Sequence, residues 1–186
     1  MNIPAAMQAV VVSEPGGPAV LQLVEADVPV IGAHEVLVAV HAAGVNRPDC
    51  LQRQGLYPLP PGVSEFPGLE IAGEVVATGS QVTRWRVGDR IIALTHGGGY
   101  AQYTSVHEEH CIAWPHGLDK FAAAAIPETC FTVQYNVFTR AKLVQGETIL
   151  IHGGSSGIGS TAIQLAKAAG ATVITHVGNE QKMRDC

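Results

Sequence analysis

Short stretches in which apolar and polar residues alternate fill the first two thirds of the chain, and this period of two is typical of β-strands. We expect strands at residues 8–12, 20–26, 34–43, 75–77, 90–94 and 100–104, with turns rich in glycine and proline between them. The first two should pair as a hairpin. Residues 34–43 should be buried on both faces, because both of their alternating sets are largely apolar. Short strands at this spacing indicate a β-barrel or sandwich.

The pattern changes near residue 119, where helical spacing replaces the alternation. Residues 119–125 predict a short helix with Asp119 as its N-cap, which Pro127 should break. Residues 128–141 predict a longer helix that stops before Gly146. We therefore place a boundary near residues 122–128, with a β-rich domain at 1–125 and an α/β domain at 126–186.

The last stretch predicts a βαβ unit. Residues 148–152 and 171–176 are short apolar strands, and a glycine-rich loop at 153–159 follows the first of them. The helix after the loop has apolar residues at helical spacing, and Gly170 stands where a C-terminal glycine belongs. The crossover of such a unit is right-handed in almost every known case.

A glycine loop between a strand and a helix predicts a binding site for a dinucleotide pyrophosphate, because its backbone N–H groups can approach the phosphates. This loop departs from the strict Gly-x-Gly-x-x-Gly pattern, since Ser156 stands where glycine is commoner. Gly157 and Gly159 suit close packing of the helix on the strand. An ordinary tight turn is the alternative interpretation.

The end of the second strand bears on the type of cofactor. An NAD site usually places Asp or Glu there to bind the ribose 2′-hydroxyl. Here His176 ends the strand and Glu180 comes only later, while Asn179 and Lys182 could bind a 2′-phosphate. We therefore expect NADPH. The alternative for Lys182 is an ordinary solvated surface lysine.

The composition of the chain argues against several classes of function and location. The chain has 186 residues, of which 47% are apolar, and a formal charge of −5, which argues against a nucleic-acid partner. No apolar run approaches the ~20 residues that cross a bilayer, and the first six residues should form a disordered lead and no secretory signal. The four cysteines show no zinc-like spacing, so we expect reduced thiols in a cytoplasmic protein: Cys50, Cys111, Cys130 and Cys186.

Three segments resemble signatures of the medium-chain dehydrogenase/reductase superfamily: Gly44-Val45-Asn46-Arg47-Pro48-Asp49, Pro67-Gly68-Leu69-Glu70-Ile71-Ala72-Gly73 and Ile151-His152-Gly153-Gly154-Ser155-Ser156-Gly157-Ile158-Gly159. The resemblance runs from about Met7 to Lys182. It is greatest to the zinc-free quinone oxidoreductase, or zeta-crystallin-like, branch, and within it to the p53-inducible quinone oxidoreductase group. It implies an α/β plus β fold, in which an N-terminal GroES-like β-barrel is followed by the first part of a Rossmann domain.

The resemblance also implies an activity and its residues. Family members bind NADPH and reduce quinones or related enones by hydride transfer without a metal. Asn46 and Tyr57 match residues near the nicotinamide and the substrate mouth, so both are catalytic candidates, and Asn46 is also a cofactor-binding candidate. Further cofactor contacts are implied for Thr132, Ser156, Gly157, Ile158, Gly178, Asn179 and Lys182. Each has a structural alternative: Asn46 could form hydrogen bonds within its loop, Tyr57 could cover the hydrophobic core, and Thr132 could be an ordinary residue on a helix surface.

Family members normally continue well past residue 186, so we expect either a shortened product or a fragment. The alternative function is a catalytically inactive piece that binds nucleotide or a partner. The full-length form should be a homo-oligomer, and the natural electron acceptor is left open.

A first prediction concerns zinc. In the zinc enzymes of the superfamily a Cys follows the first Gly-Val and a His follows the second Gly, where this chain has Asn46 and Leu69. Neither side chain can serve as a thiolate or imidazole ligand. The purified protein should therefore carry no stoichiometric zinc. Elemental analysis tests this, and a content of about one zinc per chain would contradict it.

Overall fold

The computed structural model describes residues 3–186 and forms two compact units, one that ends at Pro127 and one that spans Glu128–Cys186. The boundary falls just beyond the expected division at 125/126. Part of the expected N-terminal lead, residues 1–2, lies outside the described residues, and the first strand already begins at Ala6. Within the described range, no helix is both long and apolar enough to cross a membrane.

Unit 1 opens with the predicted hairpin. Strand β1 (Ala6–Val12) pairs antiparallel with β2 (Leu21–Asp27), and a short 3-10 turn, η1 (Pro18–Val20), precedes the second strand. Ala9 forms an isolated antiparallel bridge with Ala101, which connects the hairpin to the rest of the unit.

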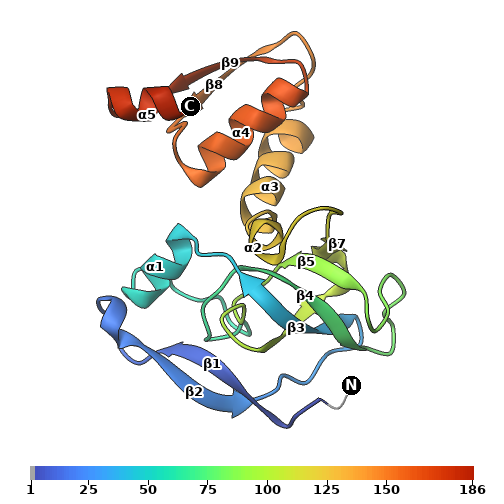
Figure 1. Ribbon diagram of the computed structural model, residues 1–186. Coiled ribbons are helices and arrows are strands. Elements are labelled where there is room, and N and C mark those ends of the chain that lie inside the picture. Colours follow the sequence, from blue (N-terminus) through green and yellow to red (C-terminus); the bar gives the residue numbers. More distant parts are fainter. Residues whose placement is uncertain (1–2) are drawn as a thin grey trace. The chain divides into compact units, whose positions relative to one another are not determined.

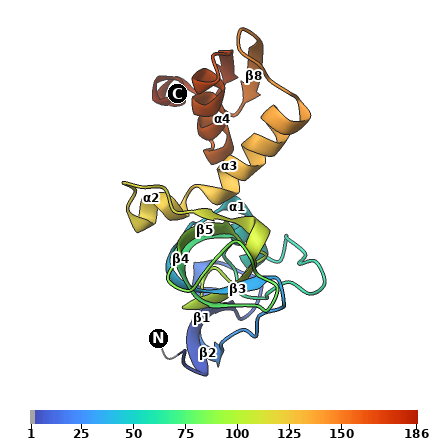
Figure 2. The same cartoon turned by 90° about the vertical axis from the view of Figure 1, so that its right-hand side faces the viewer.

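A five-stranded antiparallel sheet in the order β6-β3-β4-β5-β7 makes up most of unit 1. Its strands are β3 (Glu35–Ala43), β4 (Glu70–Thr78), β5 (Arg90–Leu94), β6 (Tyr103–His107) and β7 (Cys111–Ala113). The register of β3 on β4 shifts twice, between Leu37 and Val38 and between Val40 and Ala42. Such irregularities bend a sheet, and Figure 2 shows these strands curling around a common centre.

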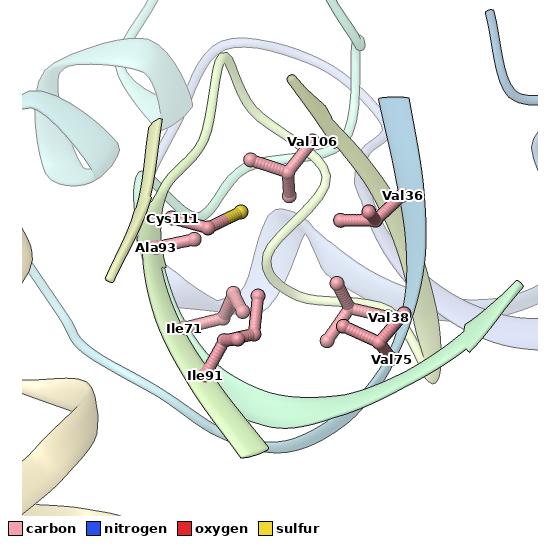
Figure 3. Close-up of a cluster of buried hydrophobic side chains, with 8 residues drawn as sticks. All are labelled: Val36, Val38, Ile71, Val75, Ile91, Ala93, Val106 and Cys111. Atoms are coloured by element: carbon pink, nitrogen blue, oxygen red, sulfur yellow. The ribbon is translucent and has the colours of Figure 1, made fainter. Parts of the chain in front are cut away.

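Eight buried side chains fill that centre: Val36, Val38, Ile71, Val75, Ile91, Ala93, Val106 and Cys111. Figure 3 shows them converging from the curved strands. Close packing at Gly73 brings β3 and β4 together, since a Cβ there would overlap the carbonyl oxygen of Ala39. The GroES-like β-barrel expected from the sequence is thereby confirmed.

Helix α2 (Lys120–Ala124) covers part of the sheet from outside. Asp119 is its N-cap, as predicted, and accepts hydrogen bonds from the N–H groups of Phe121 and Ala122 at 2.9 and 2.8 Å. Its Ala123 and Ala124 are buried in a cluster with Ala72, Ile92 and Trp114.

Several predictions for unit 1 are wrong in detail. The strand expected at 100–104 begins only at Tyr103, because the N–H of Tyr100 donates to the carbonyl of Pro67 at 2.9 Å and the chain is still turning there. The strand expected at 75–77 begins much earlier, at Glu70. The side chains of Val36–Val38 are buried on both faces of the sheet, as predicted, whereas those toward the end of β3 are half-buried or exposed. Helix α1 (Arg47–Arg53), strand β7 and the turn η2 (Glu108–His110) were not predicted.

Unit 2 contains the predicted βαβ arrangement. Helix α3 (Pro127–Val133) and a π-helical segment η3 (Gln134–Arg140) lead into β8 (Thr148–His152), α4 (Gly157–Ala168), β9 (Thr172–His176) and α5 (Glu180–Asp185). Strands β8 and β9 are parallel, and Figure 1 shows α4 packed along them. Gly170 follows the last turn of α4 with a φ of 79°, as a C-terminal glycine should. This is the first part of the expected Rossmann domain.

One correction applies to unit 2. The single helix expected over residues 128–141 becomes π-helical from Gln134 onward. The carboxamide of Asn136 donates to the carbonyl of Thr132 at 2.9 Å, so a side chain occupies part of the backbone ladder at the change. Inserted side-chain hydrogen bonds of this kind disturb regular helical pairing.

The two faces of the β8–β9 sheet differ. One face packs Ile151 against Val133 and Ala162. The other presents Leu150 and Ile174, which are 57% and 54% exposed. Among the described residues the sheet has only these two strands, and Leu150 and Ile174 are exposed on its second face together with Thr148, His152, Thr172 and His176.

Candidate functional site

The glycine loop of unit 2 is organised by Ser156. This residue is the N-cap of α4: its hydroxyl donates to the carbonyl of Gly153 at 2.8 Å and accepts from the N–H of Gly159 at 2.9 Å. A Cβ on Gly159 would overlap the carbonyl oxygen of Gly153, so only glycine lets the helix approach the loop this closely. Ser156 thus takes a position where glycine is commoner without opening the turn.

The loop after β9, which leads into α5, lies at the same edge of the sheet as the glycine loop. Because β8 and β9 are parallel and in register from Thr148↔Thr172 to His152↔His176, both loops leave from the carboxyl ends of the strands. The N–H groups of Gly153 and Gly154 both donate to the carbonyl of His176, at 2.9 and 3.3 Å. Ligands of open α/β sheets bind at this edge.

The structure therefore brings six predicted residues to one edge of unit 2. Ser156, Gly157 and Ile158 start α4, and Gly178, Asn179 and Lys182 surround the start of α5. Asn179 is the N-cap of α5 and accepts from the N–H of Lys182 at 2.9 Å.

The N-terminus of α4 fits a phosphate group. Gly157 and Ile158 are exposed there, and a Cβ on Gly157 would meet only Thr129, at 3.4 Å. Helix α4 has 12 residues, so unpaired N–H groups and the helix dipole both favour an anion at this end. The end of β9 carries His176 and no carboxylate, which suits a phosphorylated ribose better than a free 2′-hydroxyl.

Thr132 lies in α3, in the same unit. Its hydroxyl donates to the carbonyl of Glu128, one turn earlier, at 2.8 Å, and its side chain is exposed. Thr129, three residues before it, is the residue that approaches Gly157. Residues three apart share a helix face, so the Thr132 side of α3 faces the start of α4.

Asn46 belongs to unit 1 and is the N-cap of α1. Its backbone N–H donates to the carboxylate of Asp49 at 2.8 Å, and its Nδ2 donates to Oε1 of Glu70, also at 2.8 Å. The asparagine is half-buried, whereas Glu70 is only 2% exposed. Its carboxamide is therefore held by a buried carboxyl group.

Asp49 is a second buried carboxylate and collects donors from three segments. Besides Asn46, it accepts from the N–H of Gly68 at 3.0 Å and from the hydroxyl of Tyr100 at 3.0 Å. Burial and the neighbouring Asp49 carboxylate raise the pKa of Tyr100 well above its ordinary value, so the phenol stays protonated and donates. The hydroxyl of Thr95 donates to the carbonyl of Gly68 at 2.8 Å and extends the network.

Sequence reasoning missed Asp49, Glu70 and Tyr100 as parts of this site. The spacing Asn46-x-x-Asp49 is a helix-start signal of the capping-box type. No signal in the sequence pairs Asn46 with Glu70 or Asp49 with Tyr100, because these partners are 24 and 51 residues apart.

Tyr57 lies in the segment after α1 and is 39% exposed. Its neighbours Leu56 and Leu59 are 67% and 36% exposed, so the phenol stands in an accessible apolar stretch. This placement differs from the alternative of a lid over the core, for which the ring would be buried.

The residues at the positions of zinc ligands do not form a metal site. Asn46 points its amide at Glu70, and Leu69 is aliphatic. Across residues 3–186, no group of three or more His, Cys, Asp or Glu side chains is arranged to hold a metal ion.

Unit 1 also contains a cavity of about 560 Å³, lined in part by His96, His107 and His110. The ring of His110 lies 5.1 Å from that of His96 and 5.6 Å from that of His107. Burial, together with the charges of His96 and His107, lowers the pKa of His110, while Glu109 acts in the opposite direction. The neutral form of the His110 ring is therefore favoured.

Comparison with known proteins supports the interpretation of both units. Residues 32–116 match the family model of the alcohol dehydrogenase GroES-like domain. The chain is 41% identical over 170 residues to a quinone oxidoreductase of Pseudomonas aeruginosa. The aligned residues make up 91% of this chain and 52% of that protein. This chain spans about half the length of the curated relatives it matches.

Solved structures agree. A quinone oxidoreductase of Pseudomonas syringae superposes with a TM-score of 0.81 at 35% identity, covering 95% of this chain and 54% of that one. The CurK enoyl reductase superposes with a TM-score of 0.85 at 31% identity, covering 98% of this chain and 57% of that one.

The histidines of the cavity predict a pH dependence for unit 1. The depressed pKa of His110 means that the native state prefers the neutral ring, so this contribution to stability is complete above the ordinary value of 6.5 and is lost as the pH falls through the native pKa. Lowering the pH from about 7.5 to about 5.5 should therefore destabilise unit 1. Denaturant unfolding followed by Trp85 and Trp114, both in this unit, measures it.

His110→Gln should lose less stability than the wild type over the same pH range, whereas the exposed His116→Gln serves as the control. Equal losses in the wild type and His110→Gln would contradict the assignment to His110.

Proposed function

We propose that this chain, which belongs to the quinone oxidoreductase branch of the medium-chain dehydrogenase/reductase superfamily, serves NADPH-dependent reduction of quinones or related enones by hydride transfer without a metal. The observation that carries the proposal is the glycine loop, which opens α4 beside the acid-free end of β9. When bound, the cofactor supplies the hydride. The small-molecule acceptor is the partner, and the reduced thiols expected of the cysteines agree with a reducing cytoplasmic setting.

Unit 2 would hold the nucleotide. Ser156, Gly157 and Ile158 would contact the pyrophosphate through the start of α4, and Thr132 would contact the cofactor from α3. Gly178, Asn179 and Lys182 would surround the 2′-phosphate, where Lys182 acts as a point charge.

Unit 1 would supply the reacting end. Hydride transfer requires the nicotinamide and the acceptor to be held in contact, and orientation provides much of the rate. Asn46 would contribute to this orientation. The phenol of Tyr57 can donate a hydrogen bond to the oxygen that gains charge, and water can deliver the proton that completes the reduction.

Two other functions have a specific observation in their favour. The likeness to the CurK enoyl reductase favours an enone over a quinone as the acceptor. The exposed apolar face around Leu150 and Ile174, in a chain about half as long as its relatives, favours a nucleotide-binding or partner-binding piece without turnover. Parallel NADPH-oxidation assays with a quinone and with an enone separate the three. In the longer relatives the same face would contribute to a complete domain, and we expect the full-length form to be a homo-oligomer.

The cofactor preference gives a prediction. NADPH should bind more tightly than NADH, because a charge-assisted contact contributes roughly 1.5–3 kcal/mol. Lys182→Ala should reduce the preference by about tenfold or more. The exposed Lys167, in the last turn of α4 and so at the end opposite the loop, provides the matched control Lys167→Ala. Titration of each variant with both cofactors measures the effect, and equal affinities of the wild type would refute NADPH specificity.

The reacting residues give another prediction. Asn46→Ala and Tyr57→Phe should each lower turnover, while the tryptophan-monitored unfolding midpoint of Tyr57→Phe stays within error, because Tyr57 is exposed. The half-buried Tyr103 offers the control Tyr103→Phe, which should leave turnover unchanged. Steady-state NADPH oxidation by the protein provides the rates. Wild-type rates in both variants would remove these residues from the site.

A further inference from the structure

We infer that Glu70 is a positioning residue for Asn46: its buried carboxylate binds Nδ2, so that the carboxamide presents its oxygen, and not its N–H groups, to the bound nicotinamide nucleotide. This inference rests on the proposed function for its ligand and on unit 1 alone for its geometry.

The Glu70 carboxylate fixes which end of the amide points where. Nδ2 of Asn46 lies 2.8 Å from Oε1 of a carboxylate that is 2% exposed. An ionised carboxylate only accepts hydrogen bonds. Rotating the amide by half a turn would place Oδ1 against Oε1, which breaks this hydrogen bond and brings two acceptors together where no water can screen them. One orientation is therefore strongly preferred.

Gly44 makes room for this contact. A Cβ on Gly44 would overlap the carboxylate of Glu70, and the N–H of Gly44 donates to the Glu70 carbonyl at 3.2 Å. The two sequence signatures, Gly44-Val45-Asn46 and Gly68-Leu69-Glu70, are thus halves of one arrangement. The glycine of the first admits the acid of the second, and that acid orients the asparagine.

Asp49 braces the same arrangement from the other side. Its carboxylate accepts the backbone N–H of Asn46 at 2.8 Å and that of Gly68 at 3.0 Å. The main chain that carries Asn46 and the main chain that leads into Glu70 are therefore tied to one group. The side chain of Asn46 is held through Glu70 and its backbone through Asp49, which leaves little freedom at this residue.

The fixed orientation determines what Asn46 can bind. Its oxygen lies at the backbone N–H of Asp49 in the capping box of α1, and its second lone pair needs another donor. A quinone offers only acceptor oxygens, whereas a nicotinamide riboside offers hydroxyl and carboxamide donors. Asn46 therefore contacts the cofactor, and the hydrogen bond to the acceptor falls to a donor such as Tyr57. The two catalytic candidates of the sequence analysis thus have different roles, with Asn46 at the cofactor and Tyr57 at the acceptor.

The direct test observes the Asn46 amide by nuclear magnetic resonance in the ¹⁵N-labelled full chain without cofactor. In the wild type, one Nδ2 proton should be shifted downfield. Glu70→Gln should change this shift, because its carboxamide can donate as well as accept. Glu74→Gln, at a half-buried acid on the same strand, is the matched control and should preserve the shift. An Asn46 amide that is the same in the wild type and Glu70→Gln would overturn the positioning role.

Cofactor titration tests the polarity. In Glu70→Gln the amide at position 46 loses its fixed direction, so the Kd for NADPH should rise about tenfold. In the double variant N46D/E70Q the new glutamine can donate to the new carboxylate, which still presents an oxygen, so the Kd should return to within about threefold of the wild type. The KM for quinone should change less than the Kd for NADPH in both.

A double variant that binds NADPH no better than Glu70→Gln would overturn the assignment of the oxygen. A wild-type chain that shows the Asn46–Glu70 bond by resonance but binds no NADPH would refute the proposed function and the ligand, while the bond itself stands. The downfield shift of the Asn46 Nδ2 proton in the wild type is itself a test, because its absence would overturn the positioning role even if a variant fails to fold.

Discussion

The arrangement of unit 1 around Asn46 depends on the buried carboxylate of Asp49. A carboxylate that is 4% exposed requires donors in place of the water it has lost, and Asp49 takes them from Asn46, Gly68 and Tyr100. These donors belong to the start of α1, the turn before β4 and the turn after β5. Removing the carboxylate would take this acceptor from one buried donor and two half-buried ones, so one side chain couples the positions of all three segments.

Contacts between residues close in sequence explain which elements could be predicted. The hairpin β1–β2, the cap of α2 by Asp119 and the βαβ unit with Gly170 all depend on turns and periods that a local pattern carries. Helix α1 was missed because its seven residues contain no complete apolar repeat, and only the Asn46-x-x-Asp49 spacing signals its start. Strand β6 was predicted to begin too early, because the hydrogen bond from the N–H of Tyr100 to the carbonyl of Pro67 joins residues far apart in the sequence.

The same distinction between contacts that are local and contacts that are distant in the sequence applies to the candidate site. The residues predicted in unit 2 gather at one edge because two parallel strands in register bring their following loops together, and this needs only the β8–β9 pairing. The network in unit 1 needs contacts across 24 and 51 residues, which no periodicity encodes. Unit 2 thus combines a locally determined loop edge with an exposed apolar face at Leu150 and Ile174.

The chemistry of positions 46 and 70 explains why an amide is suitable beside this buried acid. A thiolate at position 46 would stand next to the Glu70 carboxylate, and two buried anions at that separation are stable only with a cation between them or with a proton on one of them. The amide of Asn46 offers an N–H, which satisfies the carboxylate at 2.8 Å without either. Gly44 allows the acid to approach, and Asp49 keeps the backbone in place. A hydrogen bond from Asn46 thereby satisfies the Glu70 carboxyl group at a position where a thiolate would require a bound cation.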